Sequence, residues 1–423
     1  MKSFSQKVAN AWCSYDIANS VYKLLICTVL FPIYYHEVTA DSIIIAGTSL
    51  SRTVVYDYAL SVAYLAIAFV SPLLSGIADY GSRRRLFMRI FTYLGAASCM
   101  GMFWFKGDNI GYGLMVIMLA AIGYEGAVLF YNSFLPRIAP KEMHDVLSGK
   151  GYAWGYAGSM LLLIINLVLV MKFETFGFKT QLQALQSSFL QVGIWWFGFS
   201  WIALSFLRDS DQKHVFKENI LAKGFKELMS VQKEIFSNAT TKRFLLAFFF
   251  WSMGLQTLML VAIMFGKAEI GIEGTKLIVT IIVLQLLAIV GATFFSRISK
   301  TKGNKLSIMV MLFIWLSVCI GGYFVQNTLQ FYFLAGGVGL VMGGIQSQSR
   351  STFSKLIPHG SNDTASYFSF YNFSEKMAIV VGMFTFGFIE QVTGSMRNST
   401  LALGMFFIIA IIIFGNIKLS SNQ

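Results

Sequence analysis

Twelve long apolar stretches divide this chain, and they constrain its fold more than any other feature. Each is long enough to cross a bilayer as a helix, which takes about 20 residues at a rise of roughly 1.5 Å each. A membrane β-barrel would instead show short segments of alternating polarity. Charged residues make up only 13% of the sequence, against about a quarter in soluble proteins. The pattern predicts an all-α polytopic membrane protein with helices near residues 11–36, 54–79, 86–105, 110–136, 149–171, 187–207, 243–266, 275–297, 304–325, 329–357, 364–389 and 397–417.

The basic residues indicate how these helices are oriented. Most of the 33 lysines and arginines fall in alternate segments between the apolar stretches, beginning with the N-terminus. Cytoplasmic loops carry such an excess of positive charge. We therefore expect both termini in the cytoplasm, and we expect the membrane to be the bacterial inner (plasma) membrane.

A polar segment from Arg208 to Arg243 separates six apolar stretches from six. It predicts an N-terminal six-helix bundle at 1–207, a cytoplasmic linker at 208–242 and a C-terminal six-helix bundle at 243–423. Four apolar residues of the linker recur at helical spacing: Leu221, Phe225, Leu228 and Ile235. Such an amphipathic helix either lies on the membrane surface or binds a regulator or partner. We favour the membrane surface, because basic amphipathic stretches commonly serve only this purpose.

Composition and motifs argue against several classes of function. The net charge of +13 lies in loops and so does not indicate nucleic-acid binding. The four cysteines lie within apolar stretches without metal-ligand spacing, so we expect small buried residues and neither a metal site nor a cofactor. The four histidines form no catalytic cluster, so we expect no enzyme. We expect a monomer whose partners are a small-molecule substrate and the lipid bilayer. The alternative to a protein that moves this substrate across the bilayer is a non-transporting receptor or scaffold.

The first apolar stretch carries a polar stripe. Asp16, Asn19, Ser20 and Lys23 fall within roughly 100° of one helix face. An uncompensated charge at mid-membrane costs at least about 3 kcal/mol. The stripe must therefore face protein or a water-filled cavity.

The loop after the second stretch is short and basic. It resembles the signature of the major facilitator superfamily, in which a glycine-rich turn holds an aspartate followed by basic residues. The matching residues here are Gly76, Asp79, Arg83 and Arg84. Ser75 and Ser82 stand where the pattern usually has glycine, and in the second half Lys300 occupies the aspartate position.

Further stretches make the resemblance more specific. They are YDIANS at 15–20, the segment 71–81, YNSFLP at 131–136, GGIQSQSRS at 343–351, FYN at 370–372 and Lys376. Together they resemble the "unknown major facilitator" family, which is related to the fungal vacuolar amino-acid effluxer linked to autophagy. The resemblance implies a twelve-helix secondary carrier that works by alternating access. It leaves the substrate open; we favour an amino acid or another small anion, carried with protons, and a facilitative uniporter is the alternative.

Charged residues within the stretches are candidates for the mechanism. In this superfamily spans 1, 4, 7 and 10 line the central cavity, so Lys23 and Glu125 could pair across the first half. We hypothesise that Glu125, partly neutralised by Lys23, senses the proton or the substrate. The alternative is a static ion pair that holds two helices in register.

The eleventh stretch mirrors the first, since Ser369, Asn372 and Lys376 share one face. A lysine that faces the cavity would bind a carboxylate or phosphate of the substrate; alternatively, Lys376 neutralises its neighbour Glu375. Further candidates for hydrogen bonds to substrate are Gln256, Gln285 and Gln346, although polar side chains also join membrane helices.

A latch near the cytoplasmic ends of the helices is a separate hypothesis. Asp79 with Arg83 and Arg84 would join the two halves in one state and release them in the other. A simple topology determinant would explain the arginines but not the aspartate. Asn132 and Arg350 lie near span ends and are predicted to be gate or helix-end contacts.

Glycines at positions 337, 339, 343 and 344 predict either close approach of another helix to the tenth stretch or bending of that stretch. Their spacing could suggest a nucleotide loop, but no strand precedes them, so we exclude that interpretation.

Overall fold

The computed structural model describes residues 4–45, 47–209, 220–272 and 275–419. Within these ranges, twelve helices are long and apolar enough to cross a membrane, which confirms the predicted number. They are Gln6–Val38, Arg52–Tyr80, Arg84–Trp104, Ile110–Ile138, Lys141–Met171, Gln181–Phe206, Ala239–Ile270, Lys276–Lys302, Asn304–Phe324, Thr328–Leu356, Thr364–Thr393 and Met396–Gly415.

The chain packs as two compact units, which we call the N-terminal and the C-terminal unit. The N-terminal unit comprises Gln6–Asn132 and Ala157–Phe225, and the C-terminal unit consists mainly of Ser133–Tyr156 and the chain from Lys226 onward. The bundle boundaries predicted at 207 and 243 stay a prediction.

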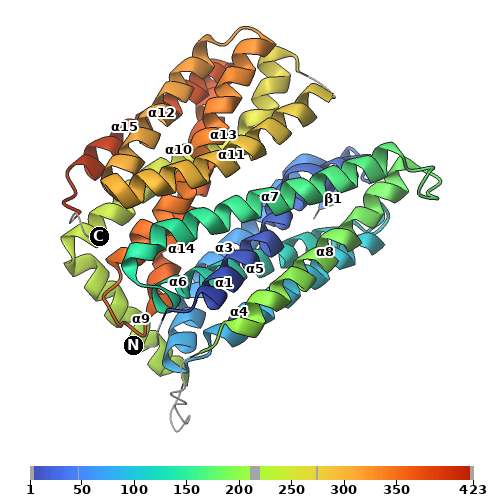
Figure 1. Cartoon of the computed structure of the whole chain (residues 1–423). Helices are drawn as coiled ribbons and strands as arrows, with labels where there is room; N and C mark the ends of the chain where they lie inside the picture. Colours follow the sequence, from blue (N-terminus) through green and yellow to red (C-terminus); the bar gives the residue numbers. More distant parts are fainter. Residues whose placement is uncertain (1–3, 46, 210–219, 273–274, 420–423) are drawn as a thin grey trace. The chain divides into compact units, whose positions relative to one another are not determined.

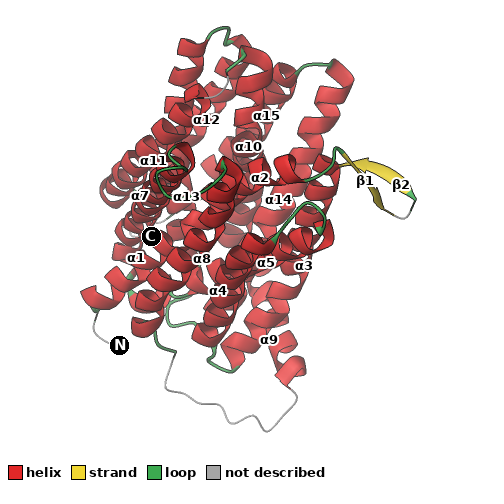
Figure 2. Cartoon of the chain, turned by 90° about the vertical axis from the view of Figure 1, so that its right-hand side faces the viewer, coloured by secondary structure: helices red, strands yellow, loops and turns green. Residues whose placement is uncertain are grey.

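The N-terminal unit holds most of the first six spans (Figure 1). Its elements are α1 (Gln6–Val21), the π-helix η1 (Tyr22–Leu30), α2 (Phe31–Val38), β1 (Ser42–Ile45), β2 (Thr48–Ser51), α3 (Arg52–Tyr80), α4 (Arg84–Gly101), the 3₁₀ helix η2 (Met102–Trp104), α5 (Ile110–Ser133), the later part of α7 (His144–Met171) and α8 (Gln181–Phe206). The strands form an antiparallel hairpin in which Ser42 pairs with Ser51 and Ile45 with Thr48 (Figure 2).

The C-terminal unit holds the last six spans. Its elements are α6 (Leu135–Ile138), the 3₁₀ helix η3 (Lys141–Met143), the start of α7, most of α9 (Ile220–Ser237), α10 (Ala239–Ile270), α11 (Thr275–Lys302), α12 (Asn304–Phe324), α13 (Thr328–Leu356), α14 (Thr364–Thr393) and α15 (Met396–Gly415).

Polar side chains define where many spans begin. A side-chain oxygen at the N-cap accepts a backbone N–H of the first turn in α3, α8, α10, α13 and α15; the caps are Ser51, Thr180, Asn238, Asn327 and Ser395. Such caps satisfy donors that the helix itself leaves unpaired.

The first span is not a uniform α-helix. Nine residues, Tyr22–Leu30, form a π-helix between α1 and α2, and the Thr28 hydroxyl donates to the Lys23 carbonyl at 3.0 Å. π-Helical segments are rare, and they occur frequently at functional sites. The hydrophobic pattern gave no sign of this change of winding, which begins next to Lys23.

Helices α7 and α9 each cross the division between the units. Residues His144 to Tyr156 of α7 pack in the C-terminal unit, and the rest of α7 packs in the N-terminal unit. In α9, Leu228 and Ile235 are buried, whereas Phe225 is 55% exposed. The linker residues 210–219 and the side chain of Leu221 lie outside the described part. The membrane-surface position of this helix stays a prediction.

Glycines let α11 and α13 approach closely in the C-terminal unit. A Cβ at Gly291 would lie 1.7 Å from the Leu340 carbonyl oxygen, and one at Gly343 would lie 2.3 Å from the Ala288 carbonyl oxygen. Gly339 and Gly344 are similarly crowded by neighbouring helices, with contacts at 2.8 and 2.6 Å. The close approach predicted for the tenth span is thus confirmed at three of its four glycines, Gly337 having looser contact at 3.6 Å.

This packing predicts that Gly291→Ala destabilises the protein by about 1–3 kcal/mol, because a backbone carbonyl must move to admit the methyl group. Gly387→Ala in α14 is the matched control, since nothing lies within 4 Å of its added Cβ and alanine favours a helix by up to about 1 kcal/mol. The measurement is the Tm of the purified variants in detergent. Equal Tm values for the two variants would contradict the proposed close contact.

Candidate functional site

A polar pocket in the C-terminal unit is the strongest candidate for a solute site. It encloses about 250 Å³ including the space at its mouth. Its lining comes from α7, α10, α13 and α14: Tyr152, Phe248, Trp251, Ser252, Leu255, Gln256, Ile345, Gln346, Ser349, Tyr371 and Glu375. Aromatic walls with a few convergent polar groups are typical of small-molecule sites.

Glu375 supplies the negative charge of this pocket. Its Oε1 accepts a hydrogen bond from Gln256 Nε2 at 2.8 Å, and its Oε2 lies 3.2 Å from Lys376 Nζ. The Glu375 side chain is 21% exposed and the Lys376 side chain 7%. Two opposite charges therefore lie side by side in the middle of a predicted span, where either alone would be costly.

The rest of the wall is organised by aromatic rings and an arginine. The rings of Phe248 and Tyr371 stack with centroids 4.1 Å apart. Gln346 Oε1 accepts a hydrogen bond from the Tyr156 hydroxyl at 2.8 Å, and the Arg350 guanidinium lies 4.3 Å from the centroid of the Tyr152 ring. These contacts hold the polar groups in place, as a preformed binding site requires.

The structure brings together only some of the residues predicted from the C-terminal half. Gln256 and Gln346 line the pocket, and Lys376 contacts Glu375. Gln285 and Asn372 are buried, but they are not among the residues that line it. Sequence reasoning treated Glu375 as a partner of Lys376 and missed Tyr152, because α7 comes from the other half of the sequence.

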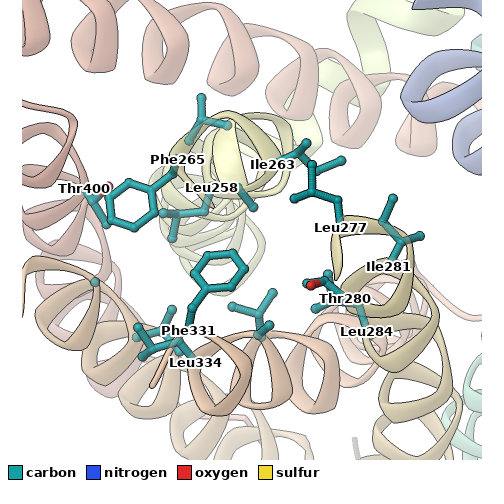
Figure 3. A pocket seen from close by; sticks show the side chains of 16 residues that line it. Leu258, Ile263, Phe265, Leu277, Thr280, Ile281, Leu284, Phe331, Leu334 and Thr400 are labelled. Carbon is teal, nitrogen blue, oxygen red and sulfur yellow. The ribbon is translucent and has the colours of Figure 1, made fainter. Parts of the chain in front are cut away.

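A second cavity in the same unit is larger and almost wholly apolar. It encloses about 700 Å³, also including its mouth, and its walls come from α10, α11, α12, α13 and α15. Figure 3 shows the rings of Phe265 and Phe331 directed into it, with Thr280 contributing a hydroxyl. It offers no charged group to a polar solute.

In the N-terminal unit, Asp16, the first residue of the polar stripe, connects α1 to α5. The Tyr131 hydroxyl donates to Asp16 Oδ2 at 2.8 Å, and Trp12 Nε1 donates to the Tyr131 carbonyl oxygen at 3.0 Å. The rings of Trp12 and Tyr131 stack at 4.6 Å. The motifs at 15–20 and 131–136 therefore meet in space, and the stripe faces protein at Asp16.

Further along the stripe, Asn19 is buried, and Ser20 and Lys23 are partly buried. Glu125 on α5 is 7% exposed. Lys23 and Glu125 both lie within electrostatic range of Cys27. The structure therefore places the two charges in one neighbourhood, and their role in coupling stays a prediction.

The loop after α3 contains a buried ion pair. Arg84 Nε lies 2.5 Å from Asp79 Oδ1, and the two side chains are 1% and 0% exposed. Nη1 and Nη2 of Arg84 are buried without a hydrogen-bond partner among the described residues. The following turn is strained, since Ser82 has φ +49°. Arg83 precedes α4, and Asn132 is buried near the end of α5.

Arg350, predicted as a gate contact, lies between α13 and α7. Its Nε donates to Ser148 Oγ at 2.9 Å, and its Nη2 donates to the Ser148 carbonyl oxygen at 3.0 Å. Below it, Asp145 pairs with Lys355, with Oδ2 and Nζ 2.7 Å apart. Sequence reasoning missed this pair because the span was expected to begin at 149, which left Asp145 in a loop.

The model of the family described as "Vacuole effluxer Atg22 like" matches residues 4–422. The chain belongs to this family. Among its relatives, the MFS-type transporter YxiO of Bacillus subtilis is 29% identical over 98% of this chain and 95% of the relative. Autophagy-related protein 22 of Kluyveromyces lactis is 25% identical over 88% of this chain and 81% of the relative.

Solved structures show the same fold. The major facilitator superfamily transporter FucP in its outward conformation has a TM-score of 0.72 at 12% identity, covering 98% of both chains. The proton:xylose symporter XylE has a TM-score of 0.68 at 14% identity, covering 97% of this chain and 94% of XylE. This Atg22-like chain is therefore a multi-pass membrane protein with the major facilitator fold, and a secondary transporter.

The strained turn predicts that Ser82→Gly stabilises the protein by about 1 kcal/mol, because a side chain in the left-handed region is disfavoured by about that amount. Ser82→Ala is the control, since it removes the hydroxyl but keeps the Cβ. Thermal unfolding of both variants tests this. A Ser82→Ala variant as stable as Ser82→Gly would mean that the hydroxyl, not the backbone, causes the effect.

Proposed function

We propose that this transporter carries a small zwitterionic solute, an amino acid, together with protons, by alternating access. The observation that carries the proposal is the pocket lined by Glu375 and Gln256, with the Lys376 ammonium 3.2 Å from the Glu375 carboxylate. The pocket wall offers a negative charge and an amide, and a positive charge adjoins that carboxylate.

A zwitterion matches this arrangement in charge. Its carboxylate can bind the compact Lys376 ammonium, and its own ammonium can bind Glu375. The exchange replaces one ion pair by two and brings no net charge into the membrane, where net charge is costly. A small anion would engage Lys376 alone and would leave Glu375 poorly compensated, so we favour the amino acid over the anion.

For proton coupling we propose Glu125, with Lys23 as its modulator. Glu125 is a buried carboxylate within a span, and such groups mark proton pathways in transporters. XylE, whose solved structure has the same fold, is named a proton:xylose symporter. A static Lys23–Glu125 pair is the competing interpretation.

We further propose that Asp79, Arg83 and Arg84 form a latch. Nη1 and Nη2 of Arg84 have no hydrogen-bond partner in the described part of the chain, which supports a second contact in another state of the cycle, since buried guanidinium nitrogens are normally bonded. Asn132 and Arg350 are proposed as gate contacts. The protein is proposed to act as a monomer in a bacterial inner membrane with both termini in the cytoplasm.

The test is binding followed by flux. A panel of amino acids, simple carboxylates and simple amines is screened by thermal stabilisation of the purified protein, because a ligand of the folded state raises its Tm. We expect amino acids to stabilise it more than either single-charge class. In proteoliposomes a pH gradient should then drive accumulation of the stabilising solute.

Variants assign the binding to the pocket. Glu375→Gln and Lys376→Met should each weaken binding by more than about tenfold, because each leaves a charge without its partner. The exposed Glu174→Gln and Lys179→Met are matched controls. Equal stabilisation by simple carboxylates would contradict the zwitterion; binding without flux would indicate a receptor, and flux indifferent to pH would indicate a uniporter.

A further inference from the structure

The apolar cavity of the C-terminal unit lies toward one end of the helices that form it. Phe265 lies in the last two turns of α10, Leu277 in the first turn of α11 and Phe331 in the first turn of α13. Gly322 lies in the last turn of α12, and Thr400 in the second turn of α15. The pattern of basic residues predicts that these helix ends face the outer side of the membrane. The cavity therefore lies in the outer half of the predicted bilayer.

The walls of this cavity are suited to hydrocarbon alone. Its two hydroxyl groups already donate to the backbone of their own helices. Thr280 Oγ1 donates to the Lys276 carbonyl oxygen at 2.8 Å, and Thr400 Oγ1 donates to the Met396 carbonyl oxygen at 3.0 Å. The other residues that line it are aliphatic residues, phenylalanines and one glycine. Apolar cavities of this kind exclude water and bind apolar molecules.

The cavity separates α10 from α11 (Figure 3). In the described part of the chain, α10 packs chiefly on α14 and α15, and α11 packs chiefly on α13. Small side chains at Ala262 on α10 and Ala335 on α13 widen the space between them. Protein interiors are otherwise closely packed, and unfilled apolar space destabilises a protein in proportion to its volume. A molecule that fills this space would therefore stabilise this end of the unit.

The surface beside the cavity is also apolar. Leu260 and Met264 on α10 are 53% and 62% exposed, and Val279 on α11 is 44% exposed. Within a span such a surface suits lipid tails, which are as apolar as leucine. Acyl chains are therefore the most abundant apolar molecules beside the cavity.

The helix ends next to the cavity carry positive charge. Lys267 near the end of α10 and Lys276 near the start of α11 are exposed. Two carboxylates occur in the same stretch of sequence. Glu269 accepts a hydrogen bond from Arg397 Nε at 2.8 Å, and Glu273 lies outside the described residues. A lysine ammonium is a compact charge on a long stem that can reach a phosphate at the membrane surface.

From these observations we propose that the cavity between α10 and α11 binds one acyl chain of an anionic phospholipid of the outer leaflet, whose phosphate contacts Lys276 and Lys267. The chain fills the space between two helices that make little contact of their own in the described part of the protein. The lipid is thus a structural ligand of the C-terminal unit. The site is separate from the polar pocket, and it depends neither on the identity of the solute nor on proton coupling.

The test is thermal stabilisation of the delipidated protein in detergent. The additions are phosphatidylglycerol, phosphatidylcholine with the same chains, the free fatty acid and glycerol phosphate. A ligand of the folded state raises the Tm. We expect phosphatidylglycerol to raise it most, phosphatidylcholine less and glycerol phosphate not at all, because both the chain and the charge contribute. Native mass spectrometry should show one phosphatidylglycerol retained by each chain.

Variants that fill the cavity assign the lipid to it. Ala335→Phe should weaken the response to phosphatidylglycerol by at least about fivefold in concentration, because the ring takes the place of the buried acyl chain. Ala262→Leu is the milder variant should the ring prevent folding. Ala97→Phe, at an exposed alanine of α4, is the matched control.

A second variant tests the headgroup contact. Lys276→Gln should reduce the preference for phosphatidylglycerol over phosphatidylcholine by about two- to fivefold, because a lysine near a membrane surface contributes about that factor toward an anionic lipid. Its response to phosphatidylcholine should be unchanged. Lys172→Gln, an exposed lysine outside the C-terminal unit, is the matched control.

Three results would overturn the proposal. One is an equal lipid response in Ala335→Phe, Ala262→Leu and Ala97→Phe. Another is stabilisation by the free fatty acid but by neither phospholipid, which would assign the cavity to a different apolar ligand. The third is a loss of stabilisation by amino acids in Ala335→Phe with an unchanged lipid response, which would assign the cavity to the solute.

Discussion

Charges buried within membrane helices must be neutralised by neighbouring side chains, and much of the described structure follows from this constraint. Water cannot hydrate them there, so an unpaired charge opposes insertion of the helix. Among the described residues, Asp79 pairs with Arg84, Asp145 with Lys355 and Glu375 with Lys376. Asp16 accepts a hydrogen bond from Tyr131. Each interaction fixes a turn, a helix contact or a pocket wall.

The three pairs differ in the sequence distance that they span, and this determines their use. Asp79 and Arg84 are five residues apart, and Glu375 and Lys376 are adjacent, so these pairs shape a turn and a pocket wall. Asp145 and Lys355 are 210 residues apart and join helices from opposite halves of the sequence. A short-range pair can persist through a rearrangement of the bundles, whereas a long-range pair can be broken by one.

The sequence predicted the membrane architecture well, because the hydropathy of a span is a sum of single-residue contributions over a long window and needs no knowledge of contacts. It also identified Gln256, Gln346 and Lys376, since a polar group in an apolar span stands out without knowledge of its partners. It did not predict the π-helix at Tyr22, which depends on how η1 packs. It also missed Asp145, because a carboxylate at the start of a span resembles a loop residue until Asn304 and Lys355 are brought beside it.

The long separation of Asp145 from Lys355 also bears on how the protein is made. The start of α7 is synthesised about 200 residues before α13, which at the usual rate of translation corresponds to roughly 10–40 s. During that interval the Asp145 carboxylate has neither Lys355 nor Asn304 beside it. Asp145 lies in the first turn of α7, and a charge near a helix end costs less in a bilayer than one at its centre. Biogenesis thus favours a carboxylate at the start of the helix over one at its middle, because its basic partner is synthesised much later.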